Sequence, residues 1–303
     1  MPKILRIYLE PHLLKTARAG EFGFGNRVRA AFEARGFRVD FVRDTDAERL
    51  KSATRKGYAL FVMKDPFHSK ALSMRKAYYF PYWRIEATDK RWAFEVAKKT
   101  FDSAEIDPDI AQAWFTRWQR NLFKRGPQNA ERTGMIYVPL QGKLLDHRSF
   151  QSMSPVDMVT AVQDWAGERK ILLGLHPNED YSPEEISAVE AIADGDPRVT
   201  LKTGGMEEAL RLCDCVVTEN STAALSGLFF EKPAVLFAQS DFHHQMPQVS
   251  QLGVQDALRA LEEGQPDYAK YLYWFIQMNS IKADTDEADA QIIDSVTRKG
   301  WIV

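Results

Sequence analysis

The sequence has few cysteines, no long apolar run and no excess of charge of one sign. Its 303 residues include two cysteines, and the formal net charge is -2 at pH 7. No apolar run approaches the roughly 20 residues that a membrane-spanning helix needs. The short apolar run at the N-terminus is broken by Arg6 and does not suit a signal peptide. We therefore expect a globular, cytoplasmic protein.

The scarcity of metal ligands and of basic charge argues against a metal-binding protein and against a general nucleic-acid binder. Cys213 and Cys215 form a C-x-C half-site without other cysteines to complete it, so we expect both to be small buried residues. No clustered acidic motif suits Mg²⁺, and we expect neither a metal nor a cofactor. A general nucleic-acid binder would usually show a basic excess, which this chain lacks.

The second half of the chain alternates apolar segments with helical patterns. Ser154-Pro155 and Ser182-Pro183 have the composition of helix starts, with a capping hydroxyl followed by proline. Five strands alternating with four helices predict a parallel, doubly wound sheet whose strands all end at one edge. The expected strands are 135–140, 171–175, 198–202, 213–218 and 233–238.

The first half is less regular but also begins with a βαβ pattern. We expect strands over 4–9, 37–42 and 58–63, a glycine-containing loop over 21–26 and a helix over 27–35. Helical periods follow at 91–100 and 110–124, and residues 268–303 are helical by the same criterion. The fold class is therefore α/β, with two Rossmann-like domains.

Polar residues follow several of these strands immediately. His176-Pro177 follows one strand, and Glu219 to Thr222 follow another. Ligands of open parallel sheets bind where strand ends meet, and helix N-termini favour phosphate. An imidazole and two hydroxyls there suit a phosphorylated ligand, most simply a nucleotide. The alternatives are a structural histidine and a plain helix cap. The predicted substrate-binding residues of this half are Gln141, His176, Pro177, Glu219, Asn220, Ser221 and Thr222.

Four segments of this half resemble the capsule polysaccharide synthesis family. They are VPLQ (138–141) followed by Asp146, LHP (175–177), CDCVVTENSTAAL (213–225) and EKPAVLF (231–237). The family consists of GT-B-type glycosyltransferases related to bacterial Kdo transferases of capsule export. The resemblance spans about a third of the chain. It implies two domains facing a cleft, a nucleotide-sugar donor, cytidine-linked in the related enzymes, and catalysis without a metal.

The resemblance also implies a domain organisation. We expect an acceptor-side domain over 1–128, a nucleotide-sugar-binding domain over 129–265 and C-terminal helices over 266–303 that cross back to the first domain. Two positions depart from the family pattern. Gly142 replaces a proline after Gln141, and Gly174-Leu175 replace a basic residue before the His-Pro pair. The phosphate partner then comes from Lys170, Lys202 or Arg148, or the donor differs.

The first half supplies candidates for the chemical step. An inverting sugar transfer needs a general base, and a retaining transfer can use a carboxylate nucleophile. Glu10, Asp65 and His68 lie just past strand ends and are the candidate catalytic residues. The alternative for each is stabilisation of its loop. In a GT-B enzyme, the loop containing Gly25 and Asn26 would line the cleft from the acceptor side.

Aromatic and basic residues are interleaved over 78–84 and 114–120. On a helix, Trp114 and Trp118 would share a face that packs against the core or meets a lipid-linked acceptor. The sequence thus predicts a glycosyltransferase that moves a sugar from a nucleotide sugar to a glycan or glycolipid in surface polysaccharide biosynthesis, with contact to the inner face of the membrane. The alternatives are a sugar-nucleotide epimerase and a non-catalytic polysaccharide-assembly protein.

Overall fold

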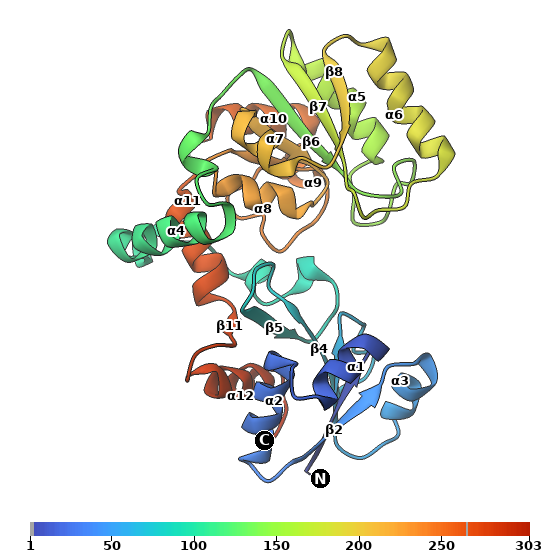
Figure 1. The fold of residues 1–303 in the computed structure, drawn as a ribbon, viewed down its shortest axis with the longest axis vertical. Helices are drawn as coiled ribbons and strands as arrows, with labels where there is room; N and C mark the ends of the chain where they lie inside the picture. The colour runs from blue at the N-terminus through green and yellow to red at the C-terminus, as the bar shows by residue number, and fades with distance from the viewer. Residues whose placement is uncertain (1–2, 265) are drawn as a thin grey trace. The chain divides into compact units, whose positions relative to one another are not determined.

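The computed structural model describes residues 3–264 and 266–303, which form two compact units (Figure 1). Unit 1 comprises Met1–Lys99 with Phe275–Val303, and unit 2 comprises Thr100–Trp274. The C-terminal segment therefore belongs to the first unit, as the resemblance implied. The breaks lie at 99/100 and 274/275 rather than after 128 and 265. Helix α4 (Pro108–Phe123) belongs to unit 2 because its buried side packs on aromatic residues of that unit.

Unit 1 is built on a six-stranded sheet of order β11-β5-β4-β3-β1-β2. The four strands from β1 to β4 are parallel, whereas β5 and β11 run antiparallel to their neighbours. The strands are β1 (Ile4–Leu9), β2 (Arg38–Arg43), β3 (Tyr58–Val62), β4 (Ala71–Lys76), β5 (Tyr82–Glu86) and β11 (Ile281–Lys282).

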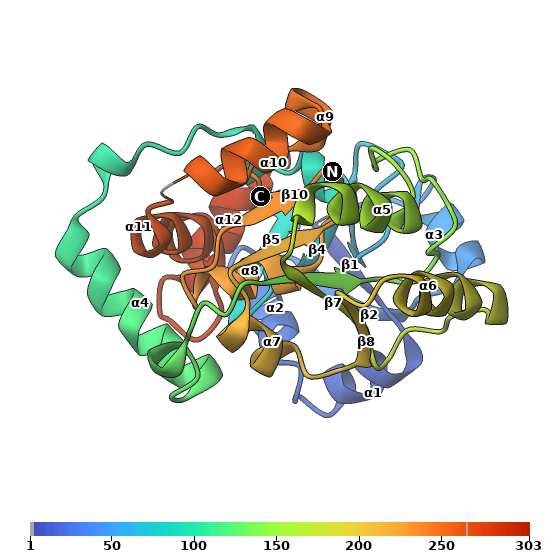
Figure 2. The ribbon, with the colours of Figure 1, turned by 90° about the horizontal axis from the view of Figure 1, so that it is seen from above.

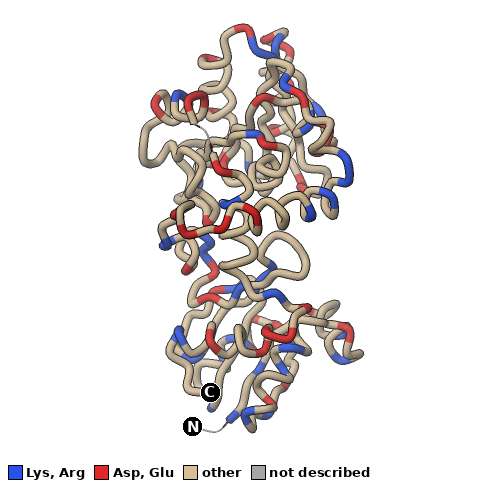
Figure 3. Tube along the Cα trace, turned by 90° about the vertical axis from the view of Figure 1, so that its left-hand side faces the viewer, with Lys and Arg blue, Asp and Glu red and all other residues tan. Residues whose placement is uncertain are grey.

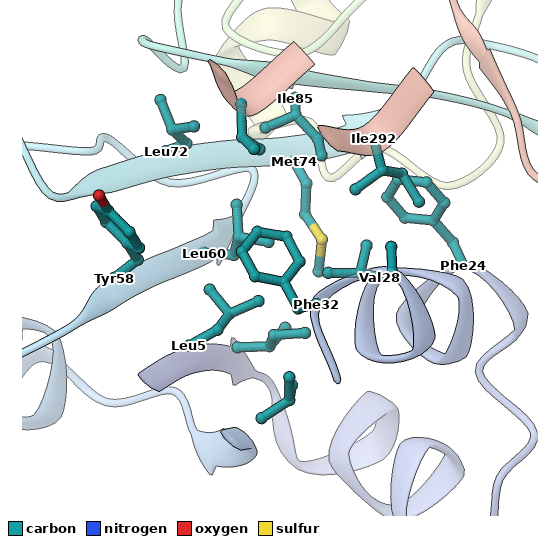
Figure 4. Close-up of a cluster of buried hydrophobic side chains, with 14 of the residues drawn as sticks. Leu5, Phe24, Val28, Phe32, Tyr58, Leu60, Leu72, Met74, Ile85 and Ile292 are labelled. Carbon is teal, nitrogen blue, oxygen red and sulfur yellow. The ribbon is translucent and has the colours of Figure 1, made fainter. Parts of the chain in front are cut away.

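Two helices from opposite ends of the chain cover one face of this sheet. Helix α2 (Gly23–Glu33) contacts helix α12 (Ala288–Arg298), and both bury apolar side chains against the strands. Figure 4 shows Val28 and Phe32 of α2 and Ile292 of α12 around the strand residue Met74. The remaining helices of the unit are α1 (Pro11–Arg18) and α3 (Asp46–Ser52).

Two parts of unit 1 differ from the sequence prediction. The helix expected over 91–100 is wrong, because only short 3₁₀ turns form at Arg91–Ala93 and Val96–Lys98. Strands β4 and β5 were not predicted. Their charged residues, including the buried Arg84 and Glu86, hide the apolar pattern that identifies a buried strand.

Unit 2 contains a five-stranded, fully parallel sheet of order β10-β9-β6-β7-β8, as the alternating pattern predicted. The strand order reverses at β6, which has β7 on one side and β9 on the other. The strands are β6 (Met135–Leu140), β7 (Lys170–Leu175), β8 (Val199–Thr203), β9 (Cys215–Thr218) and β10 (Ala234–Leu236).

The helices of unit 2 start where the sequence places capping residues. Ser154 caps α5 through the Asp157 N–H, and Ser182 forms a capping box with Glu185 at the start of α6. Helices α5 and α10 contact each other, as do α7 and α8, and the two pairs lie on opposite faces of the sheet (Figure 2). The α-helices of unit 2 that follow α4 are α5 (Pro155–Ala166), α6 (Pro183–Gly195), α7 (Met206–Leu212), α8 (Thr222–Leu228), α9 (Val249–Leu252), α10 (Val254–Glu263) and α11 (Tyr268–Leu272).

The C-terminal segment is only partly helical, which corrects the expectation for 268–303. After α11 the backbone forms a π-helix over Tyr273–Met278, then the short strand β11 and finally α12. Residue 265, the predicted end of the second domain, lies outside the described residues. Within the described part of the chain, no helix combines the length and apolar character that crossing a membrane requires.

Candidate functional site

The polar residues predicted to bind substrate gather at the carboxyl edge of the unit 2 sheet. Gln141 follows β6, His176 follows β7 and Glu219 follows β9. Strands β7 and β9 are the parallel neighbours of β6, so the three residues leave the sheet at the same edge. The edge coincides with the reversal of strand order, where open α/β sheets bind their ligands.

His176 is exposed, and its ring is oriented by the backbone that follows it. The Asn178 N–H donates to Nδ1 over 3.2 Å, so the neutral ring carries its proton on Nε2. Nε2 is therefore a hydrogen-bond donor available to a ligand, and a protonated ring would offer the same donor. Pro177 is exposed and begins the turn that places the Asn178 N–H.

Tyr181 joins the end of β7 to the end of β6. Its hydroxyl accepts a hydrogen bond of 2.8 Å from the His176 N–H and donates one of 3.3 Å to the carbonyl of Leu140. Burial raises the pKa of this phenol, which stays protonated and keeps donating. This role could not be predicted from the sequence, because a tyrosine beside a helix start has no distinguishing pattern.

Glu219 places a buried carboxyl group directly after β9. Glu219 is 2% exposed, and neither carboxylate oxygen meets the geometry of a hydrogen bond with any residue that the structure describes. Burial raises the pKa of Glu219 to about 8, and the charge of Arg148 and an interaction with the Gln151 side chain oppose that rise. A buried, unpartnered acid costs folding free energy, so its retention at a strand end points to a ligand that satisfies it.

Arg148 is the cation that accompanies this acid. Its backbone N–H and its Nε donate to Oε1 of Gln151 over 2.7 and 3.2 Å. Nε2 of Gln151 is buried and, like the Glu219 oxygens, forms no hydrogen bond of good geometry within the described residues, although the Gln151 side chain lies close enough to Glu219 to lower its pKa. The loop is held by backbone bonds to the segment after β10, from Ser152 to Phe237 and from Gln239 to Phe150.

Arg148 is thus the best placed of the three predicted phosphate partners. Lys202 is paired with Glu208 at 2.6 Å. Lys170 is the first residue of β7 and lies at the opposite edge of the sheet from His176. Arg148 is half-buried, its guanidinium lies over the Phe150 ring, and its charge lowers the pKa of Glu219.

Asn220 and Ser221 have structural partners of their own. Nδ2 of Asn220 donates to the Gln239 carbonyl over 2.9 Å. Oγ of Ser221 accepts from the Ala223 N–H over 3.2 Å and caps α8. Thr222 is exposed at the first position of this seven-residue helix. The capping interpretation of Ser221 is confirmed, and its contact with phosphate stays a prediction.

The two departures from the family pattern have local physical reasons. A Cβ at Gly142 would lie 2.8 Å from Oε2 of Glu179, in the loop that follows His176. A Cβ at Gly174 would lie 2.7 Å from the ring of Tyr137, which is 4% exposed. A side chain at position 174 would displace the buried Tyr137 ring, so packing explains Gly174, whereas at position 142 only the flexible end of Glu179 would have to move. Asp146, in the same loop as Arg148, is exposed.

In unit 1, two of the candidate catalytic residues are exposed carboxylates. Glu10 follows β1 in the N-cap position of α1, but its side chain makes no capping bond. Asp65 lies in the loop after β3. Strands β1 and β3 are parallel neighbours, so both acids leave that sheet at its carboxyl edge. Either carboxylate is open to a hydroxyl group.

His68 is enclosed, which favours its stabilising role. Nε2 lies 2.7 Å from Oγ of Ser52, and Nδ1 is buried without a partner in the described structure. Burial, with a smaller contribution from Lys70, lowers the pKa of the imidazole. Neither ring nitrogen is open to an acceptor hydroxyl. The pairing with Ser52 holds the loop after β3 against α3.

The predicted loop around Gly25 and Asn26 is instead the first turn of α2, which corrects that expectation. A Cβ on Gly25 would lie 2.3 Å from the ring of Phe22, so glycine is needed for packing. Nδ2 of Asn26 donates to the Gly20 carbonyl over 2.6 Å. Glycines are unfavourable inside helices, which is why the sequence pattern indicated a loop.

The aromatic residues of α4 face the core of unit 2. Trp114 and Trp118 are 4% and 8% exposed, and Trp114 lies against Phe229 and Tyr273. Packing, rather than contact with a lipid-linked acceptor, accounts for them. His243 and His244 stack on one another at 4.3 Å. Among the residues that the structure describes, no group of three or more His, Cys, Asp or Glu is arranged to hold a metal.

Comparison with solved structures identifies the architecture. KpsC of Thermosulfurimonas dismutans, a beta Kdo 2,7 transferase, aligns over 97% of this chain and 99% of its own, with a TM-score of 0.53 and 13% identity. The fold is similar to that of KpsC. The predicted GT-B-like fold class, with two Rossmann-like units, is thereby confirmed, and so, for the fold, is the resemblance to capsule synthesis enzymes.

Two further structures have lower scores. UDP-GlcNAc 2-epimerase from Neisseria meningitidis, bound to UDP-GlcNAc, has a TM-score of 0.38 at 10% identity, with 98% of this chain and 100% of that chain covered. MnaA from S. aureus, solved with UDP, has a TM-score of 0.40 at 13% identity, with 98% and 96% covered. No family model matches the sequence, and no curated protein does.

Proposed function

We propose that this protein is a GT-B-type glycosyltransferase of surface polysaccharide biosynthesis that uses a nucleotide-sugar donor bound by unit 2. The observation that carries the proposal is the buried Glu219 at the carboxyl edge of the sheet, whose carboxylate forms no hydrogen bond of good geometry in the described structure and whose pKa is affected by Arg148 and Gln151. The free Nε2 of His176 at the same edge and the fold similarity to KpsC support it.

The donor phosphates have two partners in this arrangement. Nε2–H of His176 donates to one phosphate oxygen, and the Arg148 guanidinium offers a planar set of donors to another. Both groups become more strongly bound as negative charge develops on the departing phosphate. Such fixed donors stabilise a leaving group without a metal ion.

Glu219 binds a hydroxyl group of the nucleotide or of the sugar. A protonated carboxyl group can donate to a hydroxyl oxygen, and a carboxylate can accept from a hydroxyl proton. Either bond satisfies an acid that otherwise stays buried without a partner. Ligands that lack the hydroxyl would leave that cost in place, so Glu219 contributes to specificity.

Asp65 or Glu10 serves as the general base of an inverting transfer. The carboxylate takes the proton of the acceptor hydroxyl while the acceptor oxygen forms a bond to the anomeric carbon. The bond from that carbon to the phosphate oxygen breaks, and its electron pair leaves with the nucleotide. The acceptor is a glycan or a glycolipid. His68 is excluded from this step because its ring nitrogens are enclosed.

A thermal-shift screen with CMP, UDP, GDP and dTDP tests nucleotide binding first. A bound ligand at about 100 times its Kd stabilises a protein by about 2.7 kcal/mol, which is readily seen as a rise in Tm. We expect one nucleotide to raise Tm, and we expect His176→Ala and Arg148→Gln to reduce the rise. His12→Ala, at an exposed histidine of unit 1, is the matched control and keeps the full effect.

Mass spectrometry of reactions with the corresponding nucleotide sugar then tests transfer. Release of nucleotide that depends on an added glycan acceptor supports the proposal, and Asp65→Asn or Glu10→Gln abolishes it. If none of the nucleotides raised the Tm, the proposal would be overturned. Conversion of the nucleotide sugar without any acceptor would instead identify an epimerase.

A further inference from the structure

Four cations stand together on the exposed side of α4 and the turn that follows it. Arg117, Arg120, Lys124 and Arg125 are all exposed, and the sequence contains no acidic residue between Asp109 and Glu131. The spacing of three residues places Arg117 and Arg120 on one face of α4, and Lys124 and Arg125 follow directly after its last residue, Phe123. We call these four residues the basic ridge.

None of the four side chains has a counter-ion or a hydrogen-bond partner in the described structure. The chain as a whole carries a formal net charge of -2, and some of its other cations are paired with acids. Arg198, for example, is paired with Asp196 at 2.6 Å. Figure 3 shows positive and negative residues interspersed along most of the trace. In the basic ridge, by contrast, four cations fall within residues 117–125 with no acidic residue among them.

The ridge contributes nothing to holding α4 in place. The opposite side of the helix does so, because Phe115 stacks on Phe229 at 5.7 Å and Nε2 of Gln119 donates to the Phe229 carbonyl over 2.7 Å. At the C-terminal end of α4 the helix dipole favours a cation such as Arg120, whereas the mutual repulsion of several neighbouring cations opposes their arrangement. An external anionic partner would relieve that repulsion.

We propose that the basic ridge docks the protein on a membrane surface rich in anionic lipids. Arg120 stands between two open hollows, one lined also by Arg117 and, at its far end along the helix, by Asp109, and the other lined also by Lys124 and Arg125. Headgroup phosphates can therefore reach its guanidinium from both sides. Ile110 precedes Arg117 by seven residues, shares its helix face and is 54% exposed, so an apolar side chain accompanies the cations at the interface.

A membrane surface fits the ridge better than an acidic glycan chain. Sugar rings are usually held by stacking on aromatic side chains together with polar contacts. The two tryptophans of α4 lie buried beneath the ridge and cannot supply such a platform. An anionic membrane requires only positive charge at its surface, and each lysine or arginine there strengthens binding roughly fivefold. The proposal concerns a different surface from the strand ends and does not rest on the proposed function.

Vesicle co-sedimentation of the full-length protein tests this surface. Vesicles of phosphatidylcholine alone are compared with vesicles containing about one third phosphatidylglycerol, at about 0.05 M and about 0.5 M salt. We expect binding to the anionic vesicles only, and its loss at high salt because the charges are then screened. The variant R117Q/R120Q/K124Q/R125Q should bind at least about a hundredfold more weakly.

A charge-matched control separates the ridge from net charge. The variant K15Q/R18Q/K56Q/K90Q also removes four exposed cations, all in unit 1, and should bind the anionic vesicles as the unmodified protein does. Circular dichroism and Tm establish that the variants fold, and R117Q/R120Q is the fallback should the quadruple variant not fold. Failure of the unmodified protein to sediment at low salt, or equal binding by the ridge variant, would overturn the proposal. Retention on alginate through the ridge without vesicle binding would point to an acidic glycan instead.

Discussion

The hydroxyl of Thr218 donates a hydrogen bond of 2.9 Å to the carbonyl of Pro139 and so joins the ends of β9 and β6. The two strands are paired only at Ile136 and Tyr137. Beyond that point Pro139 has no N–H to offer its neighbour. The side chain of Thr218 therefore replaces backbone pairing at the position from which Gln141 and Glu219 leave the sheet.

Replacing Thr218 by valine should destabilise the protein by about 1–3 kcal/mol. The change keeps the shape of the side chain but leaves the buried carbonyl of Pro139 without its partner. Urea denaturation measures the effect, and Thr200→Val on the exposed surface of β8 is the control. An equal effect at both positions would show that the bond does not hold the two strand ends together.

Glu219→Gln should stabilise the folded protein increasingly as the pH rises. The folded pKa is about 8, above the ordinary value of 4.5. Glu219 therefore favours folding below about pH 4.5, and this contribution is lost as the pH rises through 8. The neutral glutamine avoids that loss. We expect the variant to gain up to about 4 kcal/mol over unmodified protein between pH 4 and pH 9, because each pKa unit is worth about 1.4 kcal/mol.

The same variant should bind nucleotide or nucleotide sugar less tightly, by roughly tenfold or more. Greater stability with weaker binding is expected when a buried group is retained for a ligand. Denaturant titrations across the pH range and calorimetric titration measure the two effects. Glu190→Gln, at an exposed position of α6, should change neither. A variant that loses stability at high pH would contradict the assignment.

The two glycines near the site should respond differently to alanine. At Gly174 the new Cβ meets the buried ring of Tyr137, which has no room to move, so Gly174→Ala should cost about 1–3 kcal/mol. At Gly142 it meets the flexible end of Glu179, which can swing away, and the cost should stay below about 1 kcal/mol. Thermal unfolding of the two variants compares them. Equal costs would show that packing does not explain Gly174.

His68 and Ser52 should behave as one structural unit. Either residue replaced by alanine removes the same contact, so the double variant should be little less stable than each single variant. The pKa of His68 is lowered by burial, so its contribution to stability is present above about pH 6.5 and declines as the pH falls below it. Additive effects of the two replacements would exclude a shared role, and loss of transfer at unchanged stability would restore His68 as a base.

The regular parts of this fold could be predicted because their patterns are local. Strand β6 was placed over Met135–Leu140 from sequence alone, and β7 within one residue, because each begins or ends at a clear change of polarity. The hydrogen bond from Thr218 to Pro139 and the position of Arg148 beside Glu219 depend on strand order and on a loop returning to β10. Such contacts between distant segments leave no periodic signal in one sequence.

For the same reason, only some features of the candidate site could be predicted from the sequence. His176 and Glu219 could be named because polar residues that end apolar strands stand out in the sequence. The enclosure of His68 and the burial of Glu219 depend on neighbours that only the folded chain supplies. The cations of the basic ridge can be seen in the sequence, but only the structure shows that Trp114 and Trp118 of α4 are buried.

A crystal structure of the protein with the nucleotide that raises its Tm most tests the central claim directly. We predict phosphate oxygens within hydrogen-bond distance of Nε2 of His176 and of the Arg148 guanidinium, and a hydroxyl group of the ligand on the carboxyl group of Glu219. A nucleotide bound elsewhere, with Glu219 still unpartnered, would contradict the account.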